Sequence, residues 1–280
     1  MIYSSIFQTM IRYGMRTSAG AQRSLSAGPS SSQLQQPLIE LLEHNVRPGH
    51  FNEYLRFTND TAQLQRSLFP LRFFSFPDTG GKLLTATHAY YYQGGHTERD
   101  QVRNENRKNV AWAKYEDQAL PLLDSCQSNI FVEASLVSEI PEVSGLSKEV
   151  PGELESASFF SGQQQDPGGC ILELRRYHLK LGYDTVPKFL EFYESGLPSK
   201  LRAPGNCPTT SLVTLLYSDV GRLNEVIEIW RHGNGTTAME QSRAAARSAQ
   251  EWRTAIANIA GLAIQFTTSI HRPTWFSPVK

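Results

Sequence analysis

The side chains best suited to chemistry lie in one alternating stretch of the sequence, Ile171 to Gly182. The stretch reads Ile-Leu-Glu-Leu-Arg-Arg-Tyr-His-Leu-Lys-Leu-Gly, and its alternation of apolar and polar residues predicts a half-buried strand. Successive side chains of a strand point to opposite faces, so Glu173, Arg175 and Tyr177 share one face. A buried glutamate and arginine must pair, and this face therefore predicts either a structural ion pair or a pocket for a polar ligand.

A weaker copy of this strand begins 133 residues earlier in the chain. Leu38, Glu40, Leu41 and Gly49 take the places of Ile171, Glu173, Leu174 and Gly182, but Leu42 and His44 stand where Arg175 and Tyr177 would be. Two helical segments that lie 140 residues apart have identical residues at six positions. The pairs are Gly95 and Gly235, Thr97 and Thr237, Gln101 and Gln241, Arg103 and Arg243, Arg107 and Arg247, and Trp112 and Trp252. These identities predict two copies of one unit. The paired arginines are expected on exposed helix faces, as salt-bridge donors or as contacts for an acidic partner.

Each copy has the order strand, helix, strand, strand, helix, strand, which is typical of a ferredoxin-like fold. The predicted strands are 38–46, 71–76, 83–92, 128–137, 171–179, 209–218, 222–230 and 264–271, and the predicted helices are 51–66, 97–123, 184–201 and 236–260. The predicted fold class is therefore α+β, with two tandem ferredoxin-like domains, residues 37–138 and 170–280, packed sheet to sheet. Residues 139–169 are rich in Ser, Gly, Pro, Glu and Gln and predict a flexible linker.

In this arrangement, Leu172 and Leu174 would pack on the helices and the polar face of the strand would point between the two sheets. The predicted inter-sheet site consists of Glu173, Arg175, Tyr177, Glu228, Trp230, Glu40, His44 and His88, with Tyr90 beside them. One interpretation is a structural salt bridge, and the other is a ligand pocket. If the ligand were haem, His44, His88 or His178 would have to reach the iron. Since the sequence has no phosphate-binding loop, His-Glu-x-x-His or Gly-x-Ser-x-Gly motif, it assigns no catalytic residue, cofactor or metal ligand.

Composition narrows the classes of partner and compartment. The 27 lysines and arginines balance the 27 aspartates and glutamates, which argues against nucleic acid as the main partner. Three cysteines without paired spacing predict no disulfide framework, and the absence of a long apolar run predicts no transmembrane segment. Residues 1–36 contain arginines, serines and scattered apolar residues but no acid, as in a mitochondrial targeting segment. The alternative is an unstructured tail.

The strand at Ile171 also resembles a known family. Its residues Leu172-Glu173-Leu174-Arg175-Arg176-Tyr177 and Leu179-Lys180-Leu181-Gly182 resemble the Tyr-Glu-Leu-Arg-x-Tyr-x-Leu-Lys-Pro-Gly opening of the NIPSNAP domain, although Leu181 replaces the proline. Further similarity lies in the hairpin that ends at Trp230, in the Arg-x-x-x-Arg helix with Trp252, and in the terminal Phe-Ser-Pro-Val-Lys.

The resemblance implies a fold of the dimeric α/β-barrel group and a mitochondrial protein without an established enzymatic activity. It also implies an adaptor role in mitochondrial turnover (mitophagy) or vesicle-related processes, with autophagy ubiquitin-like modifiers as partners, and it leaves a homo-oligomer possible. We therefore expect a non-enzymatic adaptor. The alternative is a small-molecule or haem-binding, monooxygenase-like barrel protein, which would need a cavity of roughly 300 Å³ or more between the sheets.

Overall fold

The structure is a computed structural model, and it describes residues 36–147 and 169–280 of the chain. Residues Gln35–Lys280 form one compact unit. The predicted targeting segment, residues 1–36, lies outside the described residues except for its last position, and so do residues 148–168 of the predicted linker. Import into mitochondria therefore stays a prediction.

The elements follow the predicted order in both halves. The first half contains β1 (Leu38–Val46), α2 (Phe51–Asp60), α3 (Ala62–Leu68), β2 (Leu71–Thr79), β3 (Thr85–Tyr92), α4 (Gly95–Asn106), α5 (Val110–Ala119), the 3-10 turn η1 (Leu120–Leu122), β4 (Leu123–Glu133) and α6 (Leu136–Glu139). The second half contains β5 (Ile171–Leu179), α7 (Thr185–Leu201), β6 (Thr210–Val220), β7 (Glu225–His232), α8 (Gly235–Ser248), α9 (Gln250–Leu262) and β8 (Ala263–Pro273).

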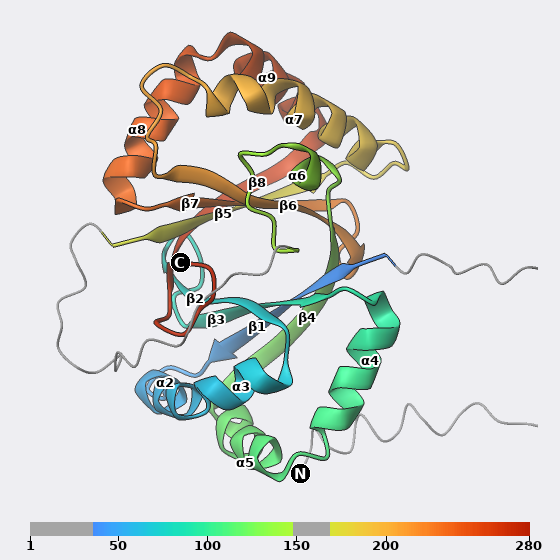
Figure 1. Cartoon of the computed structure of the whole chain (residues 1–280), viewed down its shortest axis with the longest axis vertical. Helices are drawn as coiled ribbons and strands as arrows, with labels where there is room; N and C mark the ends of the chain where they lie inside the picture. Colours follow the sequence, from blue (N-terminus) through green and yellow to red (C-terminus); the bar gives the residue numbers. More distant parts are fainter. Residues whose placement is uncertain (1–35, 148–168) are drawn as a thin grey trace, which may run out of the picture. The chain divides into compact units, whose positions relative to one another are not determined.

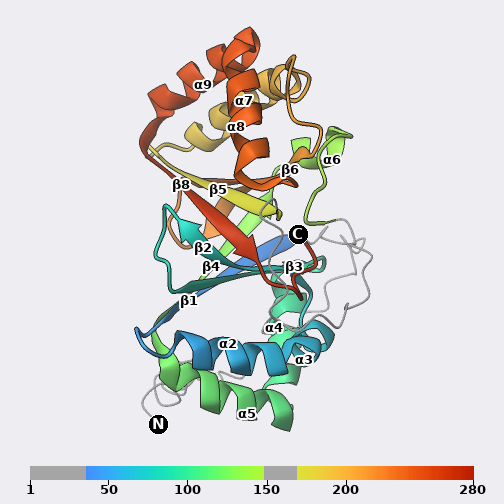
Figure 2. The same ribbon diagram turned by 90° about the vertical axis from the view of Figure 1, so that its left-hand side faces the viewer.

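The eight strands form a closed antiparallel barrel in the order β1-β3-β2-β8-β5-β7-β6-β4. Each half supplies four neighbouring strands in the same relative order, β4-β1-β3-β2 and β8-β5-β7-β6. The halves are joined along two edges, where β2 pairs with β8 and β4 pairs with β6. Figures 1 and 2 show the helices of each half on the outside of its strands. The predicted mixed class is confirmed in the form of an eight-stranded antiparallel barrel.

Three of the four predicted helices are interrupted. The helix predicted at 51–66 breaks at Thr61 into α2 and α3, and the one predicted at 97–123 breaks into α4 and α5. Asn109 starts α5, because its side-chain oxygen accepts a hydrogen bond from the backbone N–H of Trp112 at 3.0 Å. A similar break at Ala249, in extended conformation, separates α8 from α9. Among the helices of the described ranges, none has the length and apolar character needed to cross a membrane.

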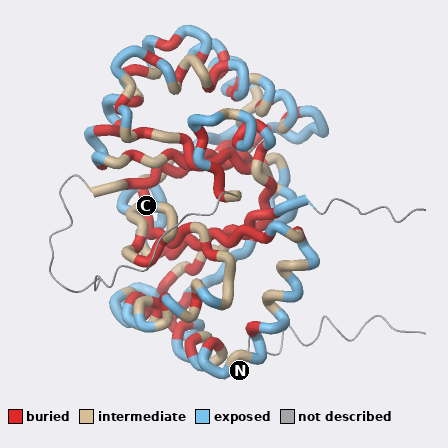
Figure 3. Tube along the Cα trace, viewed as in Figure 1, coloured by how far each residue is buried: buried red, intermediate tan, exposed pale blue. Residues whose placement is uncertain are grey.

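Buried apolar side chains form three clusters. Figure 3 shows that the strands are mostly buried. One cluster occupies the barrel interior, because it combines residues from β1 to β7 and takes none from the helices α2 to α5 or α7 to α9. Leu172 and Leu174 belong to this cluster. The prediction that these leucines pack on the helices is therefore wrong. The other two clusters lie between each half's strands and its helices.

Part of the predicted linker is packed against the barrel. Val143 and Leu146 are buried, and Leu146 lies in the barrel-interior cluster. The backbone N–H of Gly145 donates to the carbonyl of Val213 at 2.8 Å, and that of Leu146 donates to the Glu133 carboxylate at 2.7 Å. The prediction of a flexible linker is wrong for these residues, because two isolated apolar side chains anchor a segment that has no periodic pattern.

Candidate functional site

The outward face of β5 carries the polar residues that the sequence singled out. Tyr177 belongs to the cluster between the strands and the helices of the second half, and Arg243 of α8 binds Glu173. The predicted position between two sheets is therefore wrong for Glu173, Arg175 and Tyr177. Alternation separates the two faces of a strand, but it does not say which face meets the helices when both faces are buried.

Glu173 is the centre of a buried network of donors. Its carboxylate accepts hydrogen bonds from Arg175 Nε at 2.8 Å, Arg243 Nη2 at 2.5 Å and Thr268 Oγ1 at 3.2 Å, and His232 Nε2 lies at 3.1 Å. Burial by itself would raise the pKa of Glu173, but the bond to His232 and the two guanidinium groups outweigh it and lower this pKa well below its usual range. The carboxylate is therefore ionised and held in place.

Glu228 of β7 is a second buried carboxylate next to the first. It accepts hydrogen bonds from Arg175 Nη1 at 3.1 Å, Tyr177 OH at 2.8 Å and Trp230 Nε1 at 2.9 Å, and also from Tyr193 OH. Burial opposes ionisation, but the charges of Arg175 and Lys200, together with the hydrogen bonds from Tyr193 and Trp230, lower the pKa of Glu228. Arg175 therefore bridges two carboxylates, and the structural salt bridge expected from the sequence is present on the outer face of the barrel.

A buried lysine lies beside these carboxylates. The residue, Lys200, is near the end of α7 and is 4% exposed. Its Nζ atom lies 3.3 Å from the ring centroid of Trp230 and 4.6 Å from that of Trp252. Burial, followed by the nearby charge of Arg175, lowers the pKa of Lys200 well below its usual range. A weakly basic amine is thus held against two indole rings.

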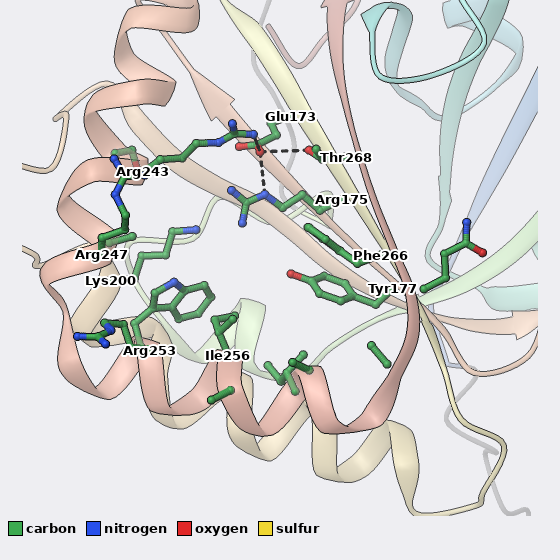
Figure 4. A pocket seen from close by; sticks show the side chains of 18 of the residues that line it. Glu173, Arg175, Tyr177, Lys200, Arg243, Arg247, Arg253, Ile256, Phe266 and Thr268 are labelled. Carbon is green, nitrogen blue, oxygen red and sulfur yellow. Dashed lines mark hydrogen bonds and ion pairs between the residues drawn. The ribbon is translucent and has the colours of Figure 1, made fainter.

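These groups border a cavity of about 870 Å³ between β5 and β8 on one side and α8 and α9 on the other. Its apolar wall includes Trp252, Ile256, Ile259 and Phe266, as Figure 4 shows in part. Arginines from both helices complete the lining, namely Arg243, Arg247 and Arg253. Exposed apolar side chains continue to the outside, since Ile264 is 70% and Phe266 50% exposed. The cavity therefore combines a hydrophobic wall with a positively charged rim.

The first half repeats the carboxylate of Glu173 but not its surroundings. Glu40 binds Arg99 at 2.9 Å, and also Arg103 and Ser128. Arg103 and Ser128 occupy the positions that Arg243 and Thr268 have in the second half. The salt-bridge alternative for these helix arginines is thus confirmed for Arg103 and Arg243.

His44 and His88 form a separate buried cluster in the first half. Their ring centroids are 4.9 Å apart, Tyr54 OH lies 2.9 Å from His44 Nδ1, and Gln65 Nε2 and Tyr90 OH approach His88 Nδ1 at 3.1 and 3.0 Å. Burial lowers the pKa of His44 to about 4 and holds that of His88 well below its usual value. Neither histidine lines the cavity, and His178 contacts Arg222 instead. The predicted site residues thus fall into two groups, one in each half.

The register of the strands explains the difference between the halves. Leu42 faces His88 across β1 and β3, while Arg175 faces Glu228 across β5 and β7. The first half therefore has a leucine opposite a histidine at the position where the second half has an ion pair. Sequence reasoning missed Lys200, although a lysine one turn after Leu197 on the buried face of a helix was a visible signal.

The fold and the cavity together define an antiparallel α/β-barrel protein with a ligand-sized cavity outside its barrel. Residues 172–278 match the NIPSNAP family model. The second half of the chain is therefore similar to the NIPSNAP domain, which confirms the resemblance of the β5 sequence. No curated protein matches the chain.

Solved structures share the fold at low sequence identity. A candidate monooxygenase from Fusobacterium nucleatum is 11% identical with a TM-score of 0.55, and the match covers 85% of this chain and 92% of that one. A candidate monooxygenase from Lactobacillus acidophilus is 8% identical with a TM-score of 0.52, covering 85% and 94%. A NIPSNAP family protein of unknown function from Agrobacterium tumefaciens is 25% identical over 40% of this chain and 96% of its own, with a TM-score of 0.35. The two longer matches show the barrel fold alone.

Proposed function

We propose that the chain is a small-molecule-binding barrel protein whose cavity takes an amphiphilic anion. The observation that supports this function is the cavity of about 870 Å³ with an apolar wall and an arginine rim. This volume falls within the range of roughly 300 to 1,000 Å³ that is usual for small-molecule sites. An apolar tail would pack on Ile256, Ile259 and Phe266, and an acidic head group would lie at the rim.

The rim arginines differ in their availability to a ligand. Arg175 and Arg243 are already bound to buried carboxylates. Arg247 and Arg253 are exposed, and within the described ranges neither has an ion-pair partner. A ligand's carboxylate or phosphate would find its strongest partner in these two guanidinium groups, which can offer paired donors to an anion.

The donor set of the cavity does not fit haem. His232 is the only histidine among the described lining residues, and both of its ring nitrogens have partners. Nε2 lies 3.1 Å from Glu173, and Nδ1 lies 2.9 Å from Thr210 Oγ1. A ring held from both sides cannot also reach iron. We therefore favour an organic anion as the ligand of this cavity.

A titration of the full chain with dodecanoate tests the proposed function, with the fluorescence of Trp252 and the other tryptophans as the readout. We expect dodecanoate to bind more tightly than dodecyltrimethylammonium, since the rim is positive. Arg247→Glu should weaken dodecanoate binding by about tenfold, or about 1.4 kcal/mol. Arg107→Glu is the matched control, because Arg107 has the equivalent position in the first half, and it should leave binding unchanged. Equal binding of both amphiphiles, or no effect of Arg247→Glu, would contradict the proposal.

We infer that the two halves are copies of one ferredoxin-like unit. The shared strand order supports this inference, and so do the equivalent pairs Glu40 with Arg103 and Glu173 with Arg243. In such a duplication, one copy can keep a structural role while the other binds a ligand. The cavity residues all come from the second copy.

We also propose that residues 1–36 direct the chain to mitochondria and that it serves there as an adaptor. The acid-free sequence of that segment supports the first part, and the NIPSNAP resemblance and the exposed apolar side chains Leu181 and Tyr183 support the second. A fluorescent reporter fused to residues 1–36 should enter mitochondria, and a diffuse cytosolic signal would refute import. A purified autophagy ubiquitin-like modifier should bind the full chain, and Leu181→Asp with Tyr183→Asp should abolish that binding; an unchanged affinity would contradict the docking role.

A further inference from the structure

One group at the cavity has no role in the ion-pair network. The side chain of Lys200, from α7, is part of the cavity lining, and its Nζ lies toward Arg175 (Figure 4). The amine lies on the ring faces of Trp230 and Trp252. Within the described part of the chain, Nζ has no hydrogen-bond acceptor. The residue is therefore buried, and it lines a ligand-sized space.

The charges around Lys200 are already balanced without it. Glu173 and Glu228 supply two negative charges, and Arg175 and Arg243 supply two positive ones through direct bonds. A protonated Lys200 would add a third positive charge, which burial and the neighbouring guanidinium of Arg175 disfavour. The pKa of Lys200 is lowered for the same reasons, with burial as the largest cause. A lowered pKa increases the share of the neutral amine, which is the nucleophilic form.

We propose that Lys200 forms an imine with the carbonyl group of an amphiphilic aldehyde or ketone that enters the cavity. This inference rests on the proposed function, because the ligand must first occupy the same cavity. The Nζ lone pair attacks the carbonyl carbon, a C–N bond forms, and the carbonyl oxygen becomes a hydroxyl. The C–O bond then breaks, and the hydroxyl leaves with the remaining nitrogen proton as one molecule of water. The products are the imine and water, so the step needs no oxidant or reductant.

The geometry also favours reaction at this lysine over the others. Lys188 lies on the same helix but its side chain is 53% exposed and pairs with Asp184. The Lys188 amine is thus exposed and held in an ion pair, whereas the Lys200 amine is buried against Trp230 and Trp252 beside the cavity. A carbonyl compound with an apolar chain should therefore modify Lys200 first.

Reductive trapping tests the inference on the full chain. The protein is incubated with 12-oxododecanoate at pH 7, reduced with sodium borohydride, digested, and analysed by mass spectrometry. We expect the adduct at Lys200 to exceed that at Lys188 by at least about tenfold. Lys200→Met should lose this adduct while leaving any labelling of Lys188 unchanged. An adduct spread evenly over exposed lysines would overturn the inference.

Dodecanoate, which has no carbonyl carbon open to imine formation, separates the two proposals. It should bind the wild type, and the thermal unfolding of both proteins checks that Lys200→Met is folded. If dodecanoate binds but Lys200 is not trapped, the imine is refuted and the ligand cavity stands. If neither amphiphile binds to the wild type, the proposed function fails and the imine fails with it. Trapping at Lys200 together with dodecanoate binding supports both.

Discussion

The Arg175–Glu228 pair offers the sharpest test of the energetics of the site. In the first half, Leu42 and His88 face each other at the equivalent register. Arg175→Leu therefore introduces the residue type that the same fold already uses at this position, and Glu228→Gln removes the opposing charge with little change in volume. A double-mutant cycle on these two substitutions measures the coupling of the pair.

Each single substitution should destabilise the fold strongly. Glu228 is fully buried and accepts bonds from Arg175, Tyr177, Trp230 and Tyr193, so its loss leaves a buried guanidinium without half of its charge partners. Removing one partner of a buried ion pair lowers the free energy of unfolding by about 3 to 5 kcal/mol. Arg175 also binds Glu173, so only part of the destabilisation by Arg175→Leu comes from its lost ion pair with Glu228. We expect the double variant to be less destabilised than the sum of the single ones by about 2 kcal/mol.

Urea unfolding followed by tryptophan fluorescence gives the four free energies of unfolding. The control cycle uses Glu43→Gln and Arg176→Leu, whose ion pair at 2.6 Å joins side chains that are 18% and 24% exposed. Solvent weakens such a pair, so its coupling should stay below about 1 kcal/mol. If the Arg175 and Glu228 effects add within about 0.5 kcal/mol, the two residues do not stabilise each other and the reasoning fails.

Two further predictions concern acid stability and helix packing. Burial holds the pKa of His44 at about 4, below its unfolded value of about 6.5, so the unfolded chain takes up the proton first and stability falls as the pH drops from 6.5 to 4. His44→Gln should reduce this loss by about 3 kcal/mol in urea titrations, and an unchanged pH profile would contradict the assignment. A Cβ atom at Gly196 would lie 2.5 Å from Ala255 Cβ, so Gly196→Ala should cost about 1 to 3 kcal/mol in the same assay. Gly261→Ala is the control, because its Cβ meets open space within α9, and it should be neutral or stabilising; equal effects at both glycines would refute the packing argument.

Strand positions could be predicted from sequence because alternation is a local property. The predicted ranges 38–46 and 171–179 coincide with β1 and β5. The orientation of those strands could not be predicted, since Leu172 and Glu173 both lie on buried faces. Which face meets the helices depends on how the two halves share edges, and this is a property of the whole barrel.

Local sequence patterns also could not predict the breaks in the helices or the presence of the cavity. Ala249, which separates α8 from α9, is a good helix former in isolation, so packing and not propensity sets its extended conformation. The cavity lies between β5 and β8 on one side and α8 and α9 on the other, so it depends on how the helices pack over the strands. Its residues Lys200 and Phe266 are distant in sequence, and no periodic pattern joins them.

A comparison of the two halves separates the residues that stabilise the fold in both halves from those that are specific to the cavity. A buried glutamate bound by a helix arginine occurs in both halves, as Glu40 with Arg103 and Glu173 with Arg243. Since the cavity is lined by the second half alone, this shared pair cannot be its distinguishing feature, and its role is to fasten each helix to its strand.

The distinguishing features are the residues without a like counterpart. Arg175 and Glu228 replace the equivalent residues Leu42 and His88, and they turn a closed aromatic and histidine cluster into a charged wall. Such a wall is costly to bury, and a purely structural role would be met equally well by the apolar and histidine pair of the first half. The ion pair also acts on the neighbouring Lys200 beside the cavity: burial is the largest cause of its lowered pKa, the charge of Arg175 lowers this pKa further, and the charge of Glu228 opposes the shift. We therefore expect the Lys200 amine, rather than the glutamate and arginine pair that both halves share, to carry the chemistry of the cavity.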